Sequence, residues 1–185
     1  MKLEDDKIVI MCKDPDQMEL GIRHLIVNYK EKLYWQIKRI VEHHDDTEEV
    51  LQNVWIKIWQ NIGGFKGESA LSTWIYRITY NESISYIQGR KKQKLVDWET
   101  SERIVESQSE DKMFSHEIYD KEAVLKKIEL AVEKLPHKQK LIFHYRYNEE
   151  MPYNQIADIT GTSEGALKAS FHHAVKKIEE FIKKN

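Results

Sequence analysis

The stretch that decides the fold is PYNQIADITGTSEGALKASFHHAVKK, residues 152–177. It predicts a helix that begins at Pro152, because the fixed φ of proline suits a first helical turn. Ala157 falls where two helices would cross closely, and Gly161 can take the positive φ of a tight turn. Ser163 is a good N-cap for a second helix. This pattern is typical of a helix-turn-helix.

The second helix of this motif has two different faces. Its predicted buried stripe consists of Leu167, Phe171, Ala174, Val175, Ile178 and Ile182. The opposite face is small, polar and basic, with Glu164, Lys168, Ala169, His172 and Lys176. Such a face suits a helix that enters the DNA major groove. The alternative is two helices of an ordinary bundle. A small residue, a turn glycine and an N-cap at the spacing of a helix-turn-helix nevertheless favour DNA binding.

The composition points to an all-α protein of one large or two small domains. Only 7 glycines and 3 prolines interrupt the 185 residues. The single Cys12 provides no disulfide framework and no CxxC metal pair, which fits a reducing cytosol. No signal peptide or membrane span is predicted, because Met1–Asp6 is charged and the apolar run Ile8–Cys12 is short. We therefore expect a cytoplasmic protein without membrane insertion.

The distribution of charge is more informative than the net charge of −2. Residues 1–63 carry 9 cations against 12 anions, and residues 64–94 carry 6 against 2. Residues 95–120 carry 2 against 8, and residues 121–185 carry 12 against 9. Two basic blocks thus flank an acidic one. This arrangement predicts two nucleic-acid contacts joined by an acidic connector.

Helical periodicity continues through the first half of the chain. It predicts a short helix over 7–12, a longer one from about 16, a third over 45–62 and a fourth from 70 to about 89. The apolar stripe of the third helix consists of Val50, Leu51, Val54, Trp55, Ile58, Trp59 and Ile62. In the fourth helix, core positions are predicted for Trp74, Ile75, Ile78 and Ile84. The remaining aromatic, amide and cationic side chains suit stacking on unpaired bases: Tyr76, Arg77, Tyr80, Asn81 and Tyr86.

A catalytic or metal-binding bundle is the weaker alternative. His43 and His44 are neighbours, so on a helix they point in different directions. No HExxH motif occurs, and no glutamate stands three residues before any histidine, so a di-iron site is not indicated. The sequence predicts no cofactor, no metal and no catalytic residue.

Two stretches resemble the extracytoplasmic-function sigma factors of the sigma-70 family. DDTEEVLQNVWIKIWQNIGGFKGESALSTWIYRITYNESISYI, residues 45–87, is similar to their second conserved region. AVEKLPHKQKLIFHYRYNEEMPYNQIADITGTSEGALKASFHHAVKKIE, residues 131–179, is similar to their fourth. The resemblance implies two small helical domains and a non-enzymatic function. The protein would bind core RNA polymerase, recognise the minus-thirty-five and minus-ten promoter elements and direct transcription initiation.

The resemblance also implies roles for residues of the second region. The helix face that docks on the polymerase clamp would be Glu49, Gln52, Asn53 and Lys57. The loop that captures a flipped base of the minus-ten element would be Lys66, Gly67, Glu68 and Ser69. The helix that borders the melted non-template strand would contribute Trp74, Arg77, Tyr80 and Asn81.

For the fourth region the resemblance implies major-groove contacts with the minus-thirty-five element. They would come from Ser163, Glu164, Lys168, Ala169, Ser170 and His172, with Lys176 on the same basic face. The chain departs from the commonest family pattern, in which arginines occupy the positions of Ser170 and His173. Fewer cations mean fewer phosphate contacts, which predicts a shallower salt dependence for this domain.

The predicted domain organisation has three parts. They are a region 2 helical domain at 1–94, an acidic linker at 95–120 and a region 4 helix-turn-helix domain at 121–185. The resemblance implies that the linker threads the RNA path of the polymerase. Many relatives are held by an anti-sigma factor, which is a further candidate partner.

A two-domain regulator is the nearest alternative, because TSEGALK is close to the response-regulator helix-turn-helix as well. Such a protein needs a receiver or ligand domain in front, and the first half lacks the alternating strands of a receiver. Regulators of that kind usually dimerise on repeated half-sites. A sigma factor is expected to be monomeric until it meets polymerase. Oligomeric state therefore separates the two.

Overall fold

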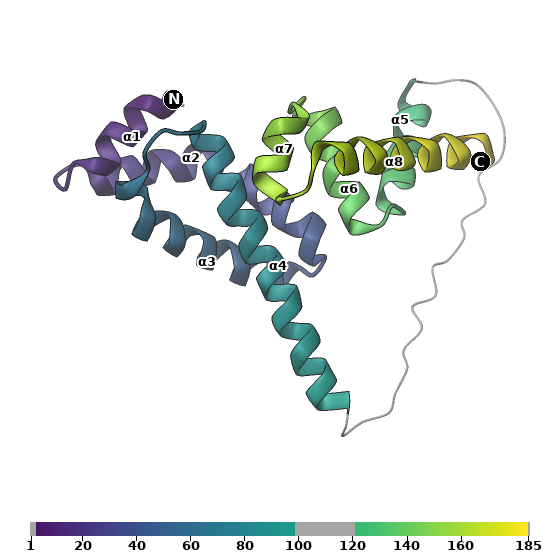
Figure 1. The fold of residues 1–185 in the computed structure, drawn as a ribbon, viewed down its shortest axis with the longest axis horizontal. Helices are drawn as coiled ribbons and strands as arrows, with labels where there is room; N and C mark the ends of the chain where they lie inside the picture. Colours follow the sequence, from purple (N-terminus) through teal and green to yellow (C-terminus); the bar gives the residue numbers. More distant parts are fainter. Residues whose placement is uncertain (1–2, 99–120, 185) are drawn as a thin grey trace.

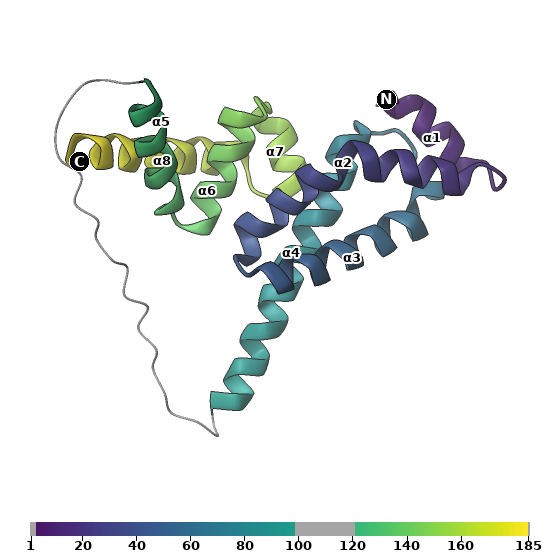
Figure 2. The same cartoon turned by 180° about the vertical axis from the view of Figure 1, so that it is seen from behind.

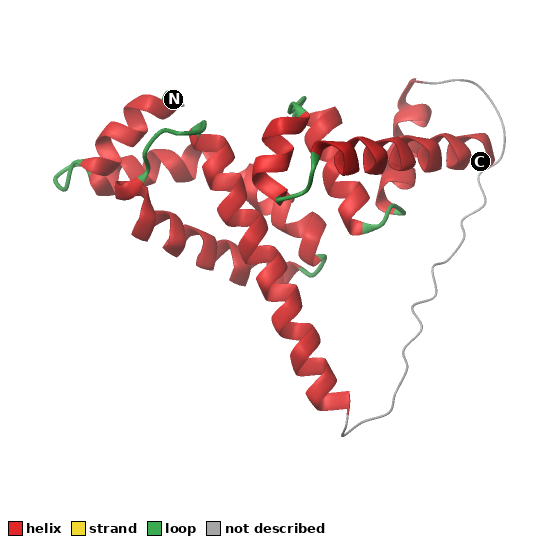
Figure 3. Ribbon diagram, in the orientation of Figure 1, coloured by secondary structure: helices red, strands yellow, loops and turns green. Residues whose placement is uncertain are grey.

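The structure is a computed structural model that describes residues 3–98 and 121–184, with side chains for 3–90 and 125–184. Every regular element in these residues is a helix, and no strand occurs among them (Figure 3). The all-α prediction is confirmed. Across the described residues, none of the helices combines the length and the apolar character that a membrane span needs.

Within the described residues, the first unit contains four α-helices and one short helical turn, which Figure 1 shows together. They are α1 (Asp5–Lys13), α2 (Met18–Val41), α3 (His44–Asn61), the 3-10 turn η1 (Ile62–Gly64) and α4 (Leu71–Trp98). Helix α4 continues nine residues past the end that we predicted near Gly89. One interior glycine costs only about 1 kcal/mol relative to alanine, and no proline follows it to end the helix.

Helices α1 and α2 approach closely at Gly21. A Cβ atom at this position would lie 2.7 Å from Cys12 Sγ and 2.9 Å from the Cys12 backbone nitrogen. Only glycine allows that separation. Cys12 is consequently sealed in the core, with 2% of its surface exposed.

The second unit holds the helix-turn-helix. Its elements are α5 (Lys121–Glu133), α6 (His137–Phe143), the π-helical turn η2 (His144–Asn148), α7 (Tyr153–Thr160) and α8 (Glu164–Lys184). Gly161 ends α7 with φ of 65°, in the left-handed region that favours glycine. The Ser163 hydroxyl accepts a long hydrogen bond of 3.4 Å from the Ala166 backbone N–H. The predicted turn glycine and N-cap are both confirmed.

The two units share one hydrophobic core. Helices α6 and α7 pack against α2 and α4, and both views of the ribbon show α7 beside α4 (Figures 1 and 2). The core cluster of the first unit continues into the second through Leu141, Ile142, Tyr145, Met151, Ile156, Ile159 and Leu167. We call this contact the interdomain seam. Most of the predicted linker, residues 99–120, lies outside the described residues.

Candidate nucleic-acid and partner interfaces

The predicted DNA-reading face of α8 is open to solvent. Its residues are exposed with the exception of the half-buried Ser170: Ser163, Glu164, Lys168, Ala169, His172 and Lys176. The opposite stripe is buried at Leu167, Ala174 and Ile178, and Phe171 is half-buried. The Lys168 ammonium lies 3.4 Å from the Glu164 carboxylate, one turn away. The two-faced character that the periodicity predicted is confirmed.

A cationic cluster adjoins this face, and sequence reasoning missed it. The Tyr153 ring, at the first residue of α7, is contacted by two cations. The Arg146 guanidinium carbon is 5.2 Å and the Lys168 ammonium 5.6 Å from its centroid. Arg146 also donates a hydrogen bond of 3.2 Å to the Met151 carbonyl. Tertiary packing thus adds one cation to a recognition face that the sequence alone makes poor in cations.

The loop before α4 is exposed where base capture is predicted. Lys66, Gly67 and Glu68 are exposed, and Ser69 is half-buried. Gly67 has φ of 75°, which a residue with a side chain rarely adopts. Phe65 anchors the loop to the core, because its side chain is buried and its ring centroid lies 5.4 Å from that of Trp74.

Helix α4 divides its predicted strand-binding residues between surface and core. Arg77 and Asn81 are exposed, whereas Trp74 and Tyr80 are half-buried. Burial raises the pKa of the Tyr80 hydroxyl above its usual range. Tyr76 was expected among the base-stacking side chains, and that expectation is wrong. Only 4% of its surface is exposed, and its ring stacks on Tyr145 with centroids 6.3 Å apart.

The solvent-facing side of α3 is both polar and apolar. Gln52 and Asn53 are exposed, as predicted for the polymerase-docking face. The other two predicted residues contact α4: Glu49 accepts a hydrogen bond of 3.2 Å from the Tyr86 hydroxyl, and Lys57 pairs with Glu82.

Two large apolar side chains lie on the same side of α3. Ile56 is 50% exposed and Trp59 is 55% exposed. The prediction that Trp59 belongs to the buried stripe is therefore wrong. Trp59 lies seven residues, or two helical turns, from Gln52. Both apolar residues consequently share the exposed side with Gln52 and Asn53.

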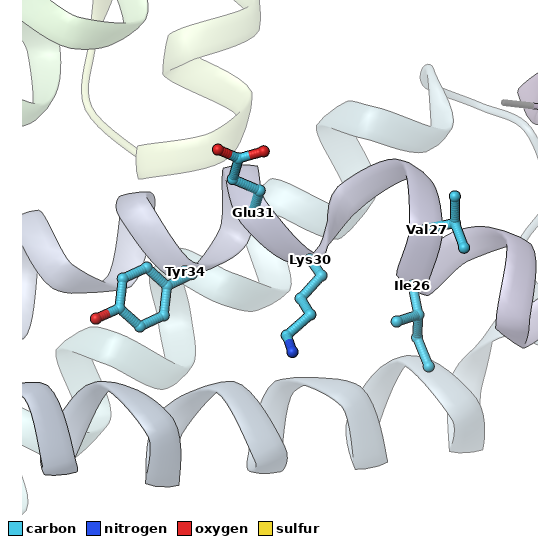
Figure 4. Close-up of a pocket in the computed structure, with 5 residues that line it drawn as sticks. All are labelled: Ile26, Val27, Lys30, Glu31 and Tyr34. Carbon is cyan, nitrogen blue, oxygen red and sulfur yellow. The ribbon is translucent and has the colours of Figure 1, made fainter. Parts of the chain in front are cut away.

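The surface of the described residues includes a hollow along α2 and another in the interdomain seam. One, of about 440 Å³, lies along α2 and is lined by Ile26, Val27, Lys30, Glu31 and Tyr34 (Figure 4). The other, of about 260 Å³, lies in the interdomain seam. It is lined from the first unit by Ile40, Tyr80, Ile84 and Ile87, and from the second by His137, Lys138, Leu141, Ile142, Thr160 and Thr162. Tyr80 therefore faces the second unit.

The two adjacent histidines, His43 and His44, both make polar contacts with other residues of the first unit. His43 precedes the first turn of α3, and its carbonyl accepts a hydrogen bond of 2.7 Å from the Thr47 hydroxyl. His44 Nδ1 lies 2.9 Å from the Tyr34 hydroxyl. Within residues 3–98 and 121–184, no three His, Cys, Asp or Glu side chains gather as a metal site would require.

Comparison with known families shows which protein family carries these surfaces. A family model of Sigma-70 region 2 matches residues 25–93, and one of Sigma-70 region 4 matches residues 125–178. Together they span two thirds of the chain. The chain belongs to the sigma-70 family. As a sigma factor it works with core RNA polymerase, recognises promoter DNA and directs transcription initiation, and its family is one of non-catalytic initiation factors.

Curated relatives place the chain among bacterial sigma factors of the extracytoplasmic-function type. It is 26% identical to the ECF RNA polymerase sigma-E factor of Escherichia coli strain K12, over 98% of this chain and 95% of that one. It is 23% identical to the sigma factor SigV of Bacillus subtilis strain 168, over 82% and 84% respectively. The first alignment runs nearly from end to end, so the order of the two regions is shared.

Solved structures share the fold. The sigma factor RpoE of Bartonella quintana, crystallised with the anti-sigma factor NepR, matches with a TM-score of 0.63. It is 21% identical, and the match covers 87% of this chain and 96% of that one. CnrH, in complex with the cytosolic domain of CnrY, matches with a TM-score of 0.65 and 13% identity over 98% of both chains.

Proposed function

We propose that this sigma factor docks on core RNA polymerase through the exposed side of α3. Gln52 and Asn53 offer uncharged hydrogen-bonding groups, and Glu49 and Lys57 flank them. Trp59 supplies the large exposed aromatic surface that binding hot spots commonly use. The contacts of Glu49 and Lys57 with α4 fix the side chains before binding, which lowers the entropic cost of docking.

The minus-thirty-five element would be recognised by α8, with its exposed face in the major groove. Lys168 is the central cation of that face, and His172 and Lys176 follow one and two turns later. We add Arg146 and Tyr153 to the predicted set, because Arg146 and Lys168 both contact the ring of Tyr153. Arg146 would contact a phosphate, and the α8 side chains would read base edges.

The minus-ten element would be bound as a melted strand along the first half of α4. Exposed Lys66, Gly67 and Glu68 provide a loop for a flipped base, and exposed Arg77 and Asn81 border the strand. Tyr80 would contribute only where the second unit does not cover it.

Several finer assignments complete the proposal. The region 2 domain would extend over 1–94 and the region 4 domain over 121–185, with the acidic residues 95–120 as linker. The protein would act in the cytoplasm, where polymerase and chromosome are, and would perform no catalysis itself. An anti-sigma factor is a candidate partner, because the similar sigma factor RpoE of Bartonella quintana was crystallised with the anti-sigma factor NepR.

Co-elution of the purified chain with bacterial core RNA polymerase on a sizing column tests the proposal. We expect a stable one-to-one complex that opens promoter DNA. The Lys168→Glu variant should still co-elute but lose minus-thirty-five recognition, because it reverses a groove-facing charge far from α3. A chain that ignores polymerase yet binds duplex DNA as a dimer would instead establish the two-domain regulator.

A further inference from the structure

Two neighbouring histidines stand on the exposed side of α8. The ring centroids of His172 and His173 lie 6.2 Å apart, with an angle of 56° between the ring planes. Both side chains are exposed, so neither is needed for the packing of the second unit. His172 belongs to the predicted DNA-reading set, whereas His173 has no role in the proposed function. The fold alone does not account for this pair.

The pair lies among lysines on the same side of the helix. His172 stands one turn after Lys168 and one turn before Lys176, so these three side chains form one row. His173 belongs to the neighbouring row and stands one turn before Lys177. All three lysines are exposed. The two histidines therefore fill the gap between the lysine at the start of this face and the two at its end.

The middle of α8 carries positive charge only. Residues 165–178 contain three lysines and no acidic residue. Protonation of both imidazoles would therefore raise the charge of this stretch from +3 to +5. The carboxylate of Glu164, at the first turn of α8, already lies 3.4 Å from the Lys168 ammonium.

The helices packed against α8 offer the two histidines no counter-charge. These helices are α5, α6 and α7. Among the side chains that the structure describes, their carboxylates are Glu129, Glu133 and Asp158, and their cationic or titratable nitrogens belong to Lys126, Lys127, His137, Lys138 and Lys140. None of these groups forms an ion pair or a hydrogen bond with His172 or His173. Glu133 is paired with Lys140 at 2.9 Å.

DNA would supply the anion that the protein lacks. Two imidazolium rings this close repel one another, and the lysines beside them add to the repulsion. A phosphate attracts both rings and accepts a charge-assisted hydrogen bond from a protonated imidazole. Histidine is also the side chain whose charge changes between about pH 5 and 8. Contact of this face with a DNA backbone therefore favours the uptake of protons.

We propose that His172 and His173 bind DNA phosphates in their protonated form, so that recognition of the minus-thirty-five element takes up protons. This inference rests on the proposed DNA-binding role of α8, and it adds His173 to that interface. Because the bound state holds more protons than the free state, the affinity for promoter DNA rises as the pH falls. Lysines at these two positions would bind phosphates throughout the neutral range, whereas histidines make the contact depend on pH.

Salt titrations of promoter binding at about pH 6 and about pH 8 test the proposal. The complex of the full chain with core polymerase is titrated onto a promoter fragment, and protection of the minus-thirty-five element is followed. We expect about tenfold tighter binding at the lower pH, since two imidazoles change charge across this interval. The slope of log affinity against log salt should also be steeper there, by about 0.9 for each histidine that contacts a phosphate.

Three variants separate the histidines from other titrating groups. The double variant His172→Gln, His173→Gln should lose both the extra affinity and the extra slope at the lower pH. His173→Lys supplies a permanent charge, so at about pH 8 it should bind several-fold more tightly than the wild type. His43→Gln is the matched control, because His43 is exposed before α3 and belongs to none of the proposed surfaces, and it should keep the wild-type pH dependence. All three retain His144, so any pH effect of that residue on stability is common to them.

Two results would contradict the proposal. A double variant that keeps the wild-type pH dependence would assign it to polymerase or to other residues of the chain. A double variant that loses affinity equally at both pH values would mean that the histidines contact DNA as neutral rings. Failure of the proposed function has a different signature: the minus-thirty-five element stays unprotected at both pH values, and Lys168→Glu has no effect on binding.

Discussion

The exposed side of α3 and the first half of α4 lie in the same unit but differ in what covers them. On α3, Gln52, Asn53 and Trp59 all face solvent. On α4, Tyr76 is buried beneath the second unit and Tyr80 is half-buried against it. The proposed polymerase surface is thus ready for binding, whereas the proposed strand-binding surface is only partly available.

Among the variants that test this difference, Trp59→Ala should have the largest effect, and the affected quantity is the affinity for polymerase. If α3 is the open docking surface, removing its exposed aromatic should weaken polymerase binding by at least ~2 kcal/mol, or about 30-fold. The thermal stability of the free chain should change little, because more than half of the side chain is already in water. A competition assay with labelled wild-type chain measures the affinity.

Trp35→Ala is the matched control for Trp59. Trp35 is 49% exposed on α2 and belongs to none of the proposed surfaces. Its loss should leave polymerase affinity within about twofold. Equal losses for the two variants would mean that α3 has no special role in docking.

Lowering the pH should reduce the free energy of unfolding through His144, a residue of η2 in the second unit. Burial, followed by the charge of Arg39, lowers the pKa of His144 to about 4 from an ordinary 6.5. The unfolded chain then binds the extra proton between these two values, so stability falls as the pH is lowered through this window. Between pH 7 and pH 5 the loss attributable to His144 is about 2 kcal/mol. Urea titrations at the two pH values measure it.

His144→Gln removes the titrating group and should flatten that dependence. The variant is informative even if it is less stable overall, because the slope with pH is the readout. A wild-type slope that persists in the variant would assign the effect to other groups.

Tyr145→Phe should strengthen the contact between the two units at the interdomain seam. The buried hydroxyl has no partner among the described residues, so its removal should stabilise the contact between the units by about 1 kcal/mol, or roughly fivefold. Energy transfer between dyes on the two units would report the shift as a larger high-transfer population. A smaller population would show that the hydroxyl is satisfied, for instance by water.

Arg146→Gln should have the smallest effect, and it concerns the recognition face. The loss of one phosphate contact should reduce the slope of log affinity against log salt by about 0.9 for promoter binding by the polymerase complex. Affinity should fall several-fold and equally for different minus-thirty-five sequences. Lys183→Gln, at the far end of α8, is the control and should leave the slope unchanged.

Local signals explain why most of the fold could be predicted from the sequence. The helix-turn-helix follows from Gly161 and Ser163, because both act on their own neighbours in the chain. The polar and apolar faces of α8 likewise follow from a period of 3.6 residues. The exposed members of the DNA-reading set, such as Lys168 and His172, were accessible to the same reasoning.

Interactions between distant segments explain what could not be predicted. Tyr76 has the chemistry of a base-stacking side chain, but its ring packs against Tyr29 and against Tyr145, which is 69 positions away in the sequence. Trp59 fits the apolar period of α3, yet none of the helices in the described residues covers that side. The Arg146–Tyr153–Lys168 cluster could not be predicted either, because the turn η2 and two helices must fold before the three side chains meet.

The close approach at Gly21 has a consequence for redox biology. It seals the only thiol of the protein inside the core, and burial raises the pKa of Cys12 above its usual range, so little reactive thiolate forms. Peroxide and disulfide reagents therefore have no accessible sulfhydryl on this sigma factor. An oxidative signal that acts through thiols must reach it by way of another protein.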